Sequence, residues 1–429
     1  MMMRRLTMRF SGGRATPAAI LIALSVALGA LGQIGAAAQT VATPATAPAT
    51  PANPAIDRLA FTVDLGDFES AAEMTFPAGQ RGPFPTVLLI AGSGPADMDF
   101  TLLDPLTGAP RSAIVRDIAE FLSARGYAVV RYNKHYITGL NDPQEIQTYY
   151  QRFTLQMLLD DASSVYEAVR ALPQVDPERI VLYGWSEGST IAVQLAIEQP
   201  VVAGLVLQGA LATTFRDAFH YQVRQLAVNY LTEVSDANRD GLIDLNELFA
   251  GYQQHPGTVA GYAFLLCFDP TSTPASPQLN AAIDQNGDEL LDISAEIIPF
   301  VDTFFATFDE TAAAGLSPYG PQYATDRQLP TILDSVAQVK QPVVILHGEN
   351  DANVPPQSSV QIDAALEAAG NTDHTLKLYP ELGHSLGLAT TVYDDAFAPI
   401  APEPLQDVAS WLDHHFGGAR FPSPPNLGR

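Results

Sequence analysis

The pentapeptide GWSEG at residues 184–188 decides the fold, because of what lies on either side of it. A short apolar run, RIVLYG at 179–184, precedes it, and an amphipathic pattern from Glu187 to Glu198 follows. A G-x-S-x-G motif between a strand and a helix is typical of a nucleophile elbow, a sharp turn that exposes a serine hydroxyl at the end of a strand. Glycines at both ends leave room for the turn and for close packing of the helix. We therefore expect Ser186 to be a nucleophile, and a serine in an ordinary turn is the alternative.

Short apolar runs recur along the chain and alternate with amphipathic patterns. The runs lie at 85–90, 127–132, 179–184, 203–209, 342–347 and 375–380. The amphipathic patterns lie at 112–125, 155–172, 187–198 and 359–369. Buried strands that alternate with helices predict an α/β fold with a mostly parallel sheet covered by helices on both faces. Alternating apolar residues at 56–77 predict an antiparallel hairpin ahead of this sheet.

The alternation stops between residues 212 and 335, where the sequence is helical in pattern and acidic, with no strand-like run. We expect this segment to be a helical cap inserted before the strand at 342–347. The core of the fold would then comprise residues 57–211 and 336–417.

A serine hydroxyl is a weak nucleophile that needs a base, and the base needs a carboxylate to orient it. Asp351 follows the predicted strand at 342–347, and His384 follows the predicted strand at 375–380. Because parallel strands end at the same edge of a sheet, both side chains can reach Ser186. Three neighbours are poorer candidates by position: Glu349, His347 and His374.

Hydrolysis through a tetrahedral intermediate also requires donors for the oxyanion. One should be the backbone amide of Glu187, at the N-terminus of the helix that follows Ser186. The other should come from the glycine-rich loop AGSGPADMD at 91–99, where we choose the Ser93 amide over that of Gly94. An ordinary tight turn is the alternative for this loop.

These motifs together resemble those of the serine α/β-hydrolases, in the branch of bacterial esterases and serine-aminopeptidase-like enzymes. The resemblance rests on GWSEG, on GSGPAD at 92–97, on RYNKHYITG at 131–139, on HGENDANVP at 347–355 and on LGHSL at 382–386. It implies an α/β-hydrolase fold and a carboxylesterase-like serine hydrolase that forms an acyl-enzyme on a small-molecule ester. The implied roles are nucleophile, acid and base for Ser186, Asp351 and His384.

The sequence departs from the pattern of related chains, which often read RYDKRGxG and GSGPxDR and have a second glycine directly after the elbow motif. The departures are at Asn133, His135, Tyr136, Met98 and Ser189. None of them touches the three implied catalytic residues, but they leave the substrate open. A serine peptidase or amidase on the same residues, and a non-catalytic calcium-dependent binding module, therefore remain alternatives.

A second motif lies in the predicted cap, where DANRDGLIDLNE at 236–247 matches the EF-hand loop D-x-[DN]-x-[DN]-G-x5-E. Gly241 permits the sharp turn of such a loop, and Ile243 would pack against a partner loop. The expected Ca²⁺ ligands are Asp236, Asn238, Asp240, the carbonyl of Leu242, Asp244 and Glu247. We expect this calcium to order the cap over Ser186 rather than to take part in the chemistry.

A weaker partner loop follows at 284–296, with the sequence DQNGDELLDISAE. Glu289 stands where glycine is expected, and Ala295 occupies the twelfth position, so that the acidic side chain comes one residue late. Leu291 occupies the position that packs against the first loop. Its candidate ligands are Asp284, Asn286, Asp288, Asp292 and Glu296.

Composition and the terminal segments restrict the class of protein. The 22 Lys and Arg against 47 Asp and Glu give a net charge of −25, which disfavours binding to nucleic acid. The single cysteine, Cys267, excludes a disulfide scaffold. Residues 1–38 combine arginines, an apolar run and small residues near Ala38, which predicts a cleaved signal peptide and export to the periplasm or the cell exterior. A retained membrane anchor is the alternative. Residues 39–56 predict a linker rich in Ala, Pro and Thr, and residues 418–429 a C-terminal tail.

Overall fold

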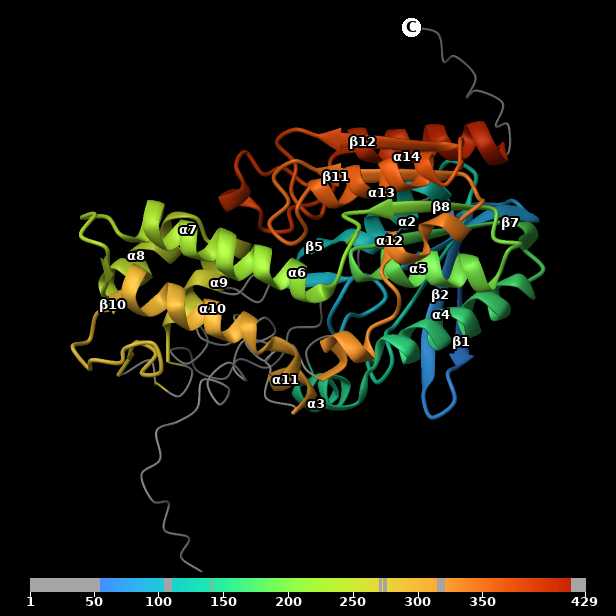
Figure 1. Cartoon of the computed structure of the whole chain (residues 1–429). Helices are drawn as coiled ribbons and strands as arrows, with labels where there is room; N and C mark the ends of the chain where they lie inside the picture. The colour runs from blue at the N-terminus through green and yellow to red at the C-terminus, as the bar shows by residue number, and fades with distance from the viewer. Residues whose placement is uncertain are drawn as a thin grey trace, which may run out of the picture.

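An eight-stranded sheet lies at the centre of the chain, in the order β1-β2-β6-β3-β7-β8-β11-β12 (Figure 1). The computed structural model describes residues 55–103, 110–139, 142–269, 272, 276–314 and 321–417. The expected signal peptide, most of the linker and the C-terminal tail lie outside these residues. The sheet strands are β1 (Ile56–Asp64), β2 (Glu69–Pro77), β3 (Phe84–Ile90), β6 (Ala128–Tyr132), β7 (Val175–Trp185), β8 (Gly204–Gln208), β11 (Val343–Gly348) and β12 (His374–Tyr379).

The sheet is parallel from β6 to β12 and antiparallel at the β1–β2 end. Strand β1 pairs with β2, and β2 with β6, in antiparallel register, whereas β6, β3, β7, β8, β11 and β12 pair in parallel. The predicted hairpin and all six predicted strands are thereby confirmed. Central strands such as β3 are buried along their whole length, because helices cover both of their faces. The fold is an α/β-hydrolase fold.

Two hydrophobic cores lie on opposite faces of the sheet. One face is covered by α2 (Ile114–Ser123) and α14 (Pro402–Phe416), whose apolar side chains pack with those of the strands. The other face is covered by α3 (Pro143–Arg152), α4 (Leu155–Arg170), α5 (Glu187–Glu198) and α13 (Gln357–Ala368). A small antiparallel pair, β4 (Thr101–Leu103) and β5 (Pro110–Ala113), precedes α2.

The segment between β8 and β11 is largely helical, and Figure 1 shows α7, α8, α9 and α10 grouped beside the sheet rather than on either face. We call residues 212–335 the insertion. Its helical elements up to residue 313 are α6 (Phe215–Phe219), η3 (His220–Ala227), α7 (Val228–Tyr230), η4 (Leu231–Ser235), α8 (Leu245–Gln254), α9 (Thr258–Cys267), η5 (Ile293–Ile297), α10 (Ile298–Ala306) and α11 (Phe308–Ala313). Short turns end it: η6 (Pro321–Tyr323), η7 (Thr325–Arg327) and α12 (Ile332–Ser335), which leads into η8 (Val336–Gln338).

The sequence predicted no strand in the insertion, and this was wrong, because the insertion contains two very short strands, β9 (Leu242–Ile243) and β10 (Leu291–Asp292). Two-residue strands leave no apolar run long enough to recognise in a sequence, which is why the pattern predicted none. Among the described helices, none is both long and apolar enough to cross a bilayer.

Candidate active site and candidate metal loops

Ser186 lies at the turn between β7 and α5, where the backbone is strained. Its φ of 56° and ψ of −123° are rare for a residue with a side chain. The turn is held because the Ser186 amide donates to the carbonyl of Gln208 on β8 at 2.8 Å, and the Ser189 amide donates to the Ser186 carbonyl at 2.9 Å. A strained residue fixed by its surroundings in this way is typical of a functional site.

The two glycines of the motif are required by close packing of backbone against backbone. A Cβ on Gly188 would lie 2.1 Å from the carbonyl oxygen of Ile90 on β3. A Cβ on Gly184 would lie 2.5 Å from the carbonyl oxygen of Gly188. Neither contact can be relieved by rotating a side chain, so α5 can approach the sheet only with glycine at both positions. Gly184 and Gly188 therefore leave room for the turn and for close packing of the helix, as the sequence predicts.

His384 and Asp351 form a buried pair at the carboxyl edge of the sheet, in the loops after β12 and β11. Nδ1 of His384 lies 2.7 Å from Oδ2 of Asp351, and both side chains are almost completely shielded from solvent. The amides of Asn353 and Val354 donate to Oδ1 of Asp351 at 2.7 and 2.8 Å. Both oxygens of the carboxylate are thus occupied, which fixes its orientation toward the imidazole.

The pair shifts the pKa values of its members in opposite directions. Burial alone would raise the pKa of Asp351, but the charge and hydrogen bonds of His384 and His347 hold it well below its usual value. Burial alone would lower the pKa of His384, but the attraction of Asp351, aided by Asp395, raises it. An ionised carboxylate therefore faces an imidazole that readily accepts a proton.

The three poorer candidates have other environments. His347 is fully buried, with Nδ1 2.6 Å from the Ser359 hydroxyl and Nε2 3.1 Å from Oδ2 of Asp351, so it supports the carboxylate from behind. Glu349 is exposed, and His374 bonds to Asp363 at the start of β12.

Two residues of this site were missed by the sequence analysis. Asp395 is buried, and its Oδ2 accepts hydrogen bonds from the amides of Ala352 and His384, both at 3.0 Å, so it joins the two loops. Gly209, just after β8, has a φ of 54°, and a Cβ there would lie 3.0 Å from two ring atoms of His384. Neither residue belongs to a local motif, because each acts through contacts between segments that are far apart in the sequence.

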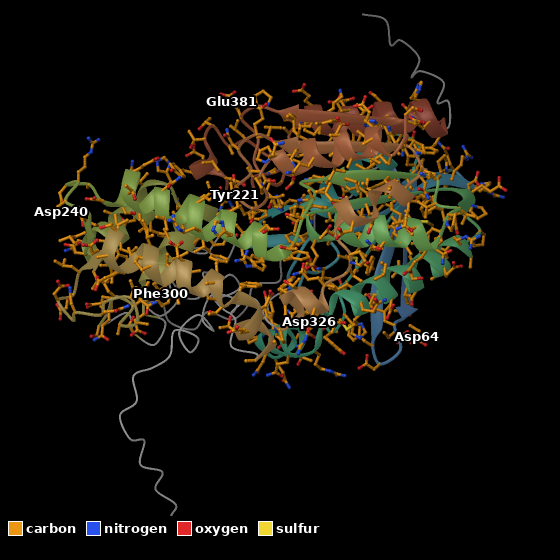
Figure 2. All side chains as sticks on the ribbon, in the orientation of Figure 1. Asp64, Tyr221, Asp240, Phe300, Asp326 and Glu381 are labelled. Carbon is orange, nitrogen blue, oxygen red and sulfur yellow. The ribbon has the colours of Figure 1, made fainter. Side chains whose placement is uncertain are left out.

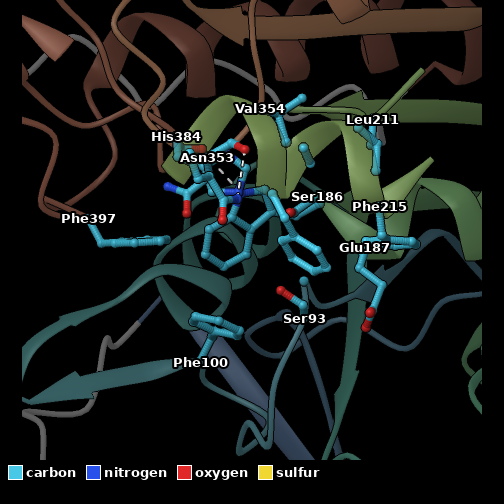
Figure 3. Close-up of a pocket in the computed structure, with 15 residues that line it drawn as sticks. Ser93, Phe100, Ser186, Glu187, Leu211, Phe215, Asn353, Val354, His384 and Phe397 are labelled. Atoms are coloured by element: carbon cyan, nitrogen blue, oxygen red, sulfur yellow. Dashed lines mark hydrogen bonds between the residues drawn. The ribbon is translucent and has the colours of Figure 1, made fainter. Parts of the chain in front are cut away.

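Ser186 and His384 line one pocket with a volume of about 80 Å³, drawn in Figure 3. Ser93 and Glu187, the expected oxyanion residues, line the same pocket. Gly92 lets the loop that bears Ser93 lie close to the nucleophile, because a Cβ on Gly92 would be only 3.1 Å from the Ser186 Cβ. Its walls are mainly apolar: Phe100, Trp185, Leu211, Phe215, Phe219, Val354 and Phe397. Among the described contacts, Ser186 Oγ and His384 make no direct hydrogen bond, and catalytic hydrogen bonds of this kind often tighten only when substrate binds.

The insertion is attached directly to the loop that bears Asp351. The Tyr221 hydroxyl donates to the backbone carbonyl of Asp351 at 3.0 Å, and the Gln222 amide nitrogen donates to the carbonyl of Asn353 at 2.9 Å. The Tyr262 hydroxyl donates to Oδ1 of Asn353 at 3.0 Å. The insertion therefore forms part of the pocket wall and also braces the acid-bearing loop.

The first candidate metal loop, 236–247, has the backbone of a tight oxygen-rich turn. Asp236 accepts from the amides of Asp240 and Gly241, and Gly241 has a φ of 82°. The side chains of Asp244 and Glu247 cap the start of α8 by exchanging hydrogen bonds with each other's amides. All of the expected donors are oxygens, which suits Ca²⁺. In the part of the chain that the structure describes, no three His, Cys, Asp or Glu side chains converge closely enough to enclose a metal ion.

The second loop pairs with the first, and a π-turn absorbs its extra residue. Ile243 of β9 and Leu291 of β10 lie opposite each other, as expected from the sequence. Glu289 takes the positive φ, 64°, that glycine would adopt more easily. The π-helix η5 adds one residue to the turn, so that Glu296 reaches back to the amides of Gln285 and Asp292, both at 3.0 Å.

Comparison with known families matches the two halves of the core separately. Residues 72–226, which include Ser186, match the model of acetyl xylan esterase (AXE1). Residues 302–418, which include Asp351 and His384, match the model of the prolyl oligopeptidase family. Both candidate metal loops lie outside these two matches.

Among curated relatives, the chain is 32% identical over 155 residues to esterase EstD of Thermotoga maritima. That match spans 36% of this chain and only 33% of EstD. Among solved structures, proline iminopeptidase of Mycobacterium smegmatis is 17% identical, with a TM-score of 0.48 over 83% of this chain and 98% of that one. Acylaminoacyl peptidase of Pyrococcus horikoshii is 12% identical, with a TM-score of 0.45 over 86% and 43%. Neither structural likeness bears on the chemistry, but the fold and the sequence matches support a serine hydrolase.

Proposed function

We propose that the protein hydrolyses carboxylic esters through an acyl-enzyme formed on Ser186. The observation that carries the proposal is the 2.7 Å contact between His384 and Asp351 at the pocket that contains the strained Ser186. The matches to acetyl xylan esterase and to esterase EstD support an ester rather than another acyl compound as substrate.

In the proposed reaction, Oγ of Ser186 attacks the ester carbonyl while Nε2 of His384 accepts the hydroxyl proton. Asp351 holds the imidazole through Nδ1 and stabilises the imidazolium that forms. The backbone amides of Glu187 and Ser93 would donate to the oxyanion. When the intermediate collapses, His384 returns the proton to the leaving alcohol. Water then attacks the acyl-serine by the same route in reverse and releases the acid.

The pocket favours short acyl groups and small alcohols. Its volume of about 80 Å³ has room for several water-sized groups, since about 10–15 Å³ of such space holds one water. Aromatic rings form much of its wall, where the ring centres of Phe100 and Trp185 are 4.5 Å apart.

The test is hydrolysis of p-nitrophenyl esters of increasing acyl length by the wild-type protein and by Ser186→Ala. We expect the acetyl and propionyl esters to be cleaved fastest and the variant to lose at least about 1,000-fold in rate. A serine-directed fluorophosphonate should label the wild-type protein and leave the variant unlabelled. Ester turnover that survives in Ser186→Ala would contradict the proposal.

The match to the prolyl oligopeptidase family favours one alternative, a serine peptidase on the same residues. An aminoacyl p-nitroanilide is the substrate that separates the two activities. Faster cleavage of the anilide than of p-nitrophenyl acetate, in terms of kcat/KM, would select the peptidase.

We also propose that the loop at 236–247 binds Ca²⁺ in an exported protein. Its ligands would be the side chains of Asp236, Asn238, Asp240, Asp244 and Glu247 and the carbonyl of Leu242. Carboxylates gathered in one turn repel one another unless a cation is present, so binding should stabilise the insertion. An affinity as weak as about 10⁻⁴ to 10⁻³ M would suit the calcium levels outside the cell.

Thermal melting in millimolar calcium and in chelator tests this metal site without measuring activity. We expect calcium to raise the Tm of the wild-type protein and to have no effect on Glu247→Gln. Glu310→Gln is the matched control, because Glu310 is an exposed acid of the insertion outside both loops. Equal melting curves in the two buffers would rule the site out.

Export itself is tested by sequencing the N-terminus of the secreted protein, which should begin near residue 39.

A further inference from the structure

Three buried polar side chains meet beside the nucleophile, and neither the implied triad nor the comparisons assign them a role. Glu187 follows Ser186 directly, and its side chain is only 1% exposed. Its Oε1 lies 3.1 Å from Nζ of Lys134, in the loop after β6, whose side chain is 8% exposed. Its Oε2 accepts a hydrogen bond at 2.7 Å from the hydroxyl of Tyr323 in the insertion. We call these three residues the elbow cluster.

The elbow cluster fixes the direction of the Glu187 side chain. Both carboxylate oxygens are occupied, and Figure 3 shows the carboxylate pointing away from Ser186 and His384. The ring of Tyr323 is itself packed, at 4.7 Å from Phe215 and 5.4 Å from Phe219. The Glu187 carboxylate therefore cannot turn into the pocket without leaving the buried Lys134 ammonium and the buried Tyr323 hydroxyl unpaired, which costs free energy.

The negative charge of Glu187 would disfavour the proposed reaction, and Lys134 lies where it can neutralise that charge. The oxyanion is expected to form against the backbone amide of this same residue, so an uncompensated carboxylate there would repel it. Electrostatic effects are strong in a site that excludes water. Lys134 is the cation that contacts Glu187 directly, and it also stands 5.9 Å from the centre of the Tyr149 ring.

Asp161 is a second carboxylate near Lys134, and both side chains line a small cavity beside the nucleophile elbow. Its volume is about 20 Å³, enough for one water, and Lys134, Glu187 and Asp161 are its charged lining residues. Asp161 is itself bonded to His135 at 3.0 Å, so its charge is shared with another partner. Lys134 thus has Glu187 as its direct ion-pair partner.

We propose that Lys134 is a positioning residue that neutralises and orients Glu187, so that the oxyanion forms against an amide whose own side chain does not repel it. Tyr323 completes the arrangement and ties the insertion to the nucleophile elbow. The proposal rests on the proposed hydrolase function, because it concerns the oxyanion of that reaction.

The test compares Lys134→Met, Glu187→Gln and the double variant with the wild-type protein, all as the whole chain. Two rates are measured, the labelling of Ser186 by a fluorophosphonate and kcat with p-nitrophenyl acetate, together with KM and Tm. Lys134→Met should lose about 100-fold in both rates, the size of losing one oxyanion donor, with little change in KM. Glu187→Gln should lose less than about 10-fold, because the remaining lysine does not repel the oxyanion. The double variant should regain at least about 10-fold of the loss in Lys134→Met.

Two further variants separate this role from a purely structural one. Lys134→Arg keeps the charge and should keep at least about a tenth of the rate. Lys377→Met removes a lysine of β12 from its ion pair with Asp407 of α14, and it should leave both rates unchanged. A purely structural pair would instead make Lys134→Met and Glu187→Gln equally slow, in proportion to their loss of Tm, without recovery in the double variant. That result would overturn the proposal.

The labelling experiment also distinguishes failure of this inference from failure of the proposed function. If the wild-type protein is labelled at Ser186 but cleaves no ester, the ester assignment fails while the labelling rates still test Lys134. If the wild-type protein is active and the variants do not differ as described, this inference alone fails. If Ser186 is not labelled at all, both fail.

Discussion

Gly209 offers the sharpest test of the geometry around His384, because substitution by alanine has two separable effects. The first is a backbone effect, since a φ of 54° costs alanine about 1 kcal/mol relative to glycine. The second is a steric effect, since the new Cβ would lie 3.0 Å from Cε1 and Nδ1 of His384 and 3.4 Å from Oδ2 of Asp351. To relieve these contacts, the imidazole must move by several tenths of an ångström. Because a misplacement of about 1 Å can cost about 100-fold in rate, we expect kcat to fall by about 10- to 100-fold.

Gly417→Ala is the matched control for this experiment. Gly417 ends α14 with the same φ of 54°, and a Cβ there would have no heavy atom within 4 Å. In urea unfolding, the free energy of unfolding should fall by about 1 kcal/mol or more in Gly209→Ala and by about 1 kcal/mol in Gly417→Ala. Only Gly209→Ala should lose esterase activity. Full activity in Gly209→Ala, or equal loss of activity in both variants, would refute the reasoning.

Three further predictions concern the loops that bear the acid and the base. In a pH profile of kcat/KM, the midpoint of the acidic limb should lie above pH 6.5, because the pKa of His384 is raised and the base is protonated below its pKa. Asp351→Asn should move this limb to lower pH, because the carboxylate that raises the pKa is lost, and should reduce kcat by about 10,000-fold. Asp395→Ala should lower stability by about 2–3 kcal/mol in urea unfolding and slow turnover, because the amides of Ala352 and His384 lose their shared acceptor. Tyr221→Phe should lower the free energy of unfolding by about 1 kcal/mol and should lower kcat by less than about 10-fold, because it removes one hydrogen bond to the loop that bears Asp351 and leaves the ring in place.

The strands and the elbow could be predicted from the sequence because each depends on a local pattern. The run before Ser186, the glycines around it and the helix after it are adjacent in the chain, and the structure shows the same order. Asp351 and His384 could be placed at the edge near Ser186 because strand direction is fixed by the crossover rule, not by detailed packing.

Other parts of the site could not be predicted, since they depend on contacts between distant segments. Asp395 lies in a loop without a motif, and it becomes important only because two other loops end beside it. Glu296 looked one residue out of place, because a π-turn leaves no mark in hydrophobic periodicity. Tyr323 carried no signal either, since its partner Glu187 is 136 positions away.

The insertion links the pocket to the first candidate metal loop through one continuous backbone segment. Residues 215–235 form consecutive helical turns whose first part contributes Phe215, Phe219 and Gln222 to the pocket, and Asp236 opens the loop directly after them. Figure 2 places Tyr221 near the junction with the sheet and Asp240 at the far end of the insertion. A cation that bound the loop would therefore sit at the end of the same helical segment that bonds, through Tyr221 and Gln222, to the loop that bears Asp351. The proposed Ca²⁺ site at one end and the proposed active site at the other therefore share a structural element, although they are separated by the length of the insertion.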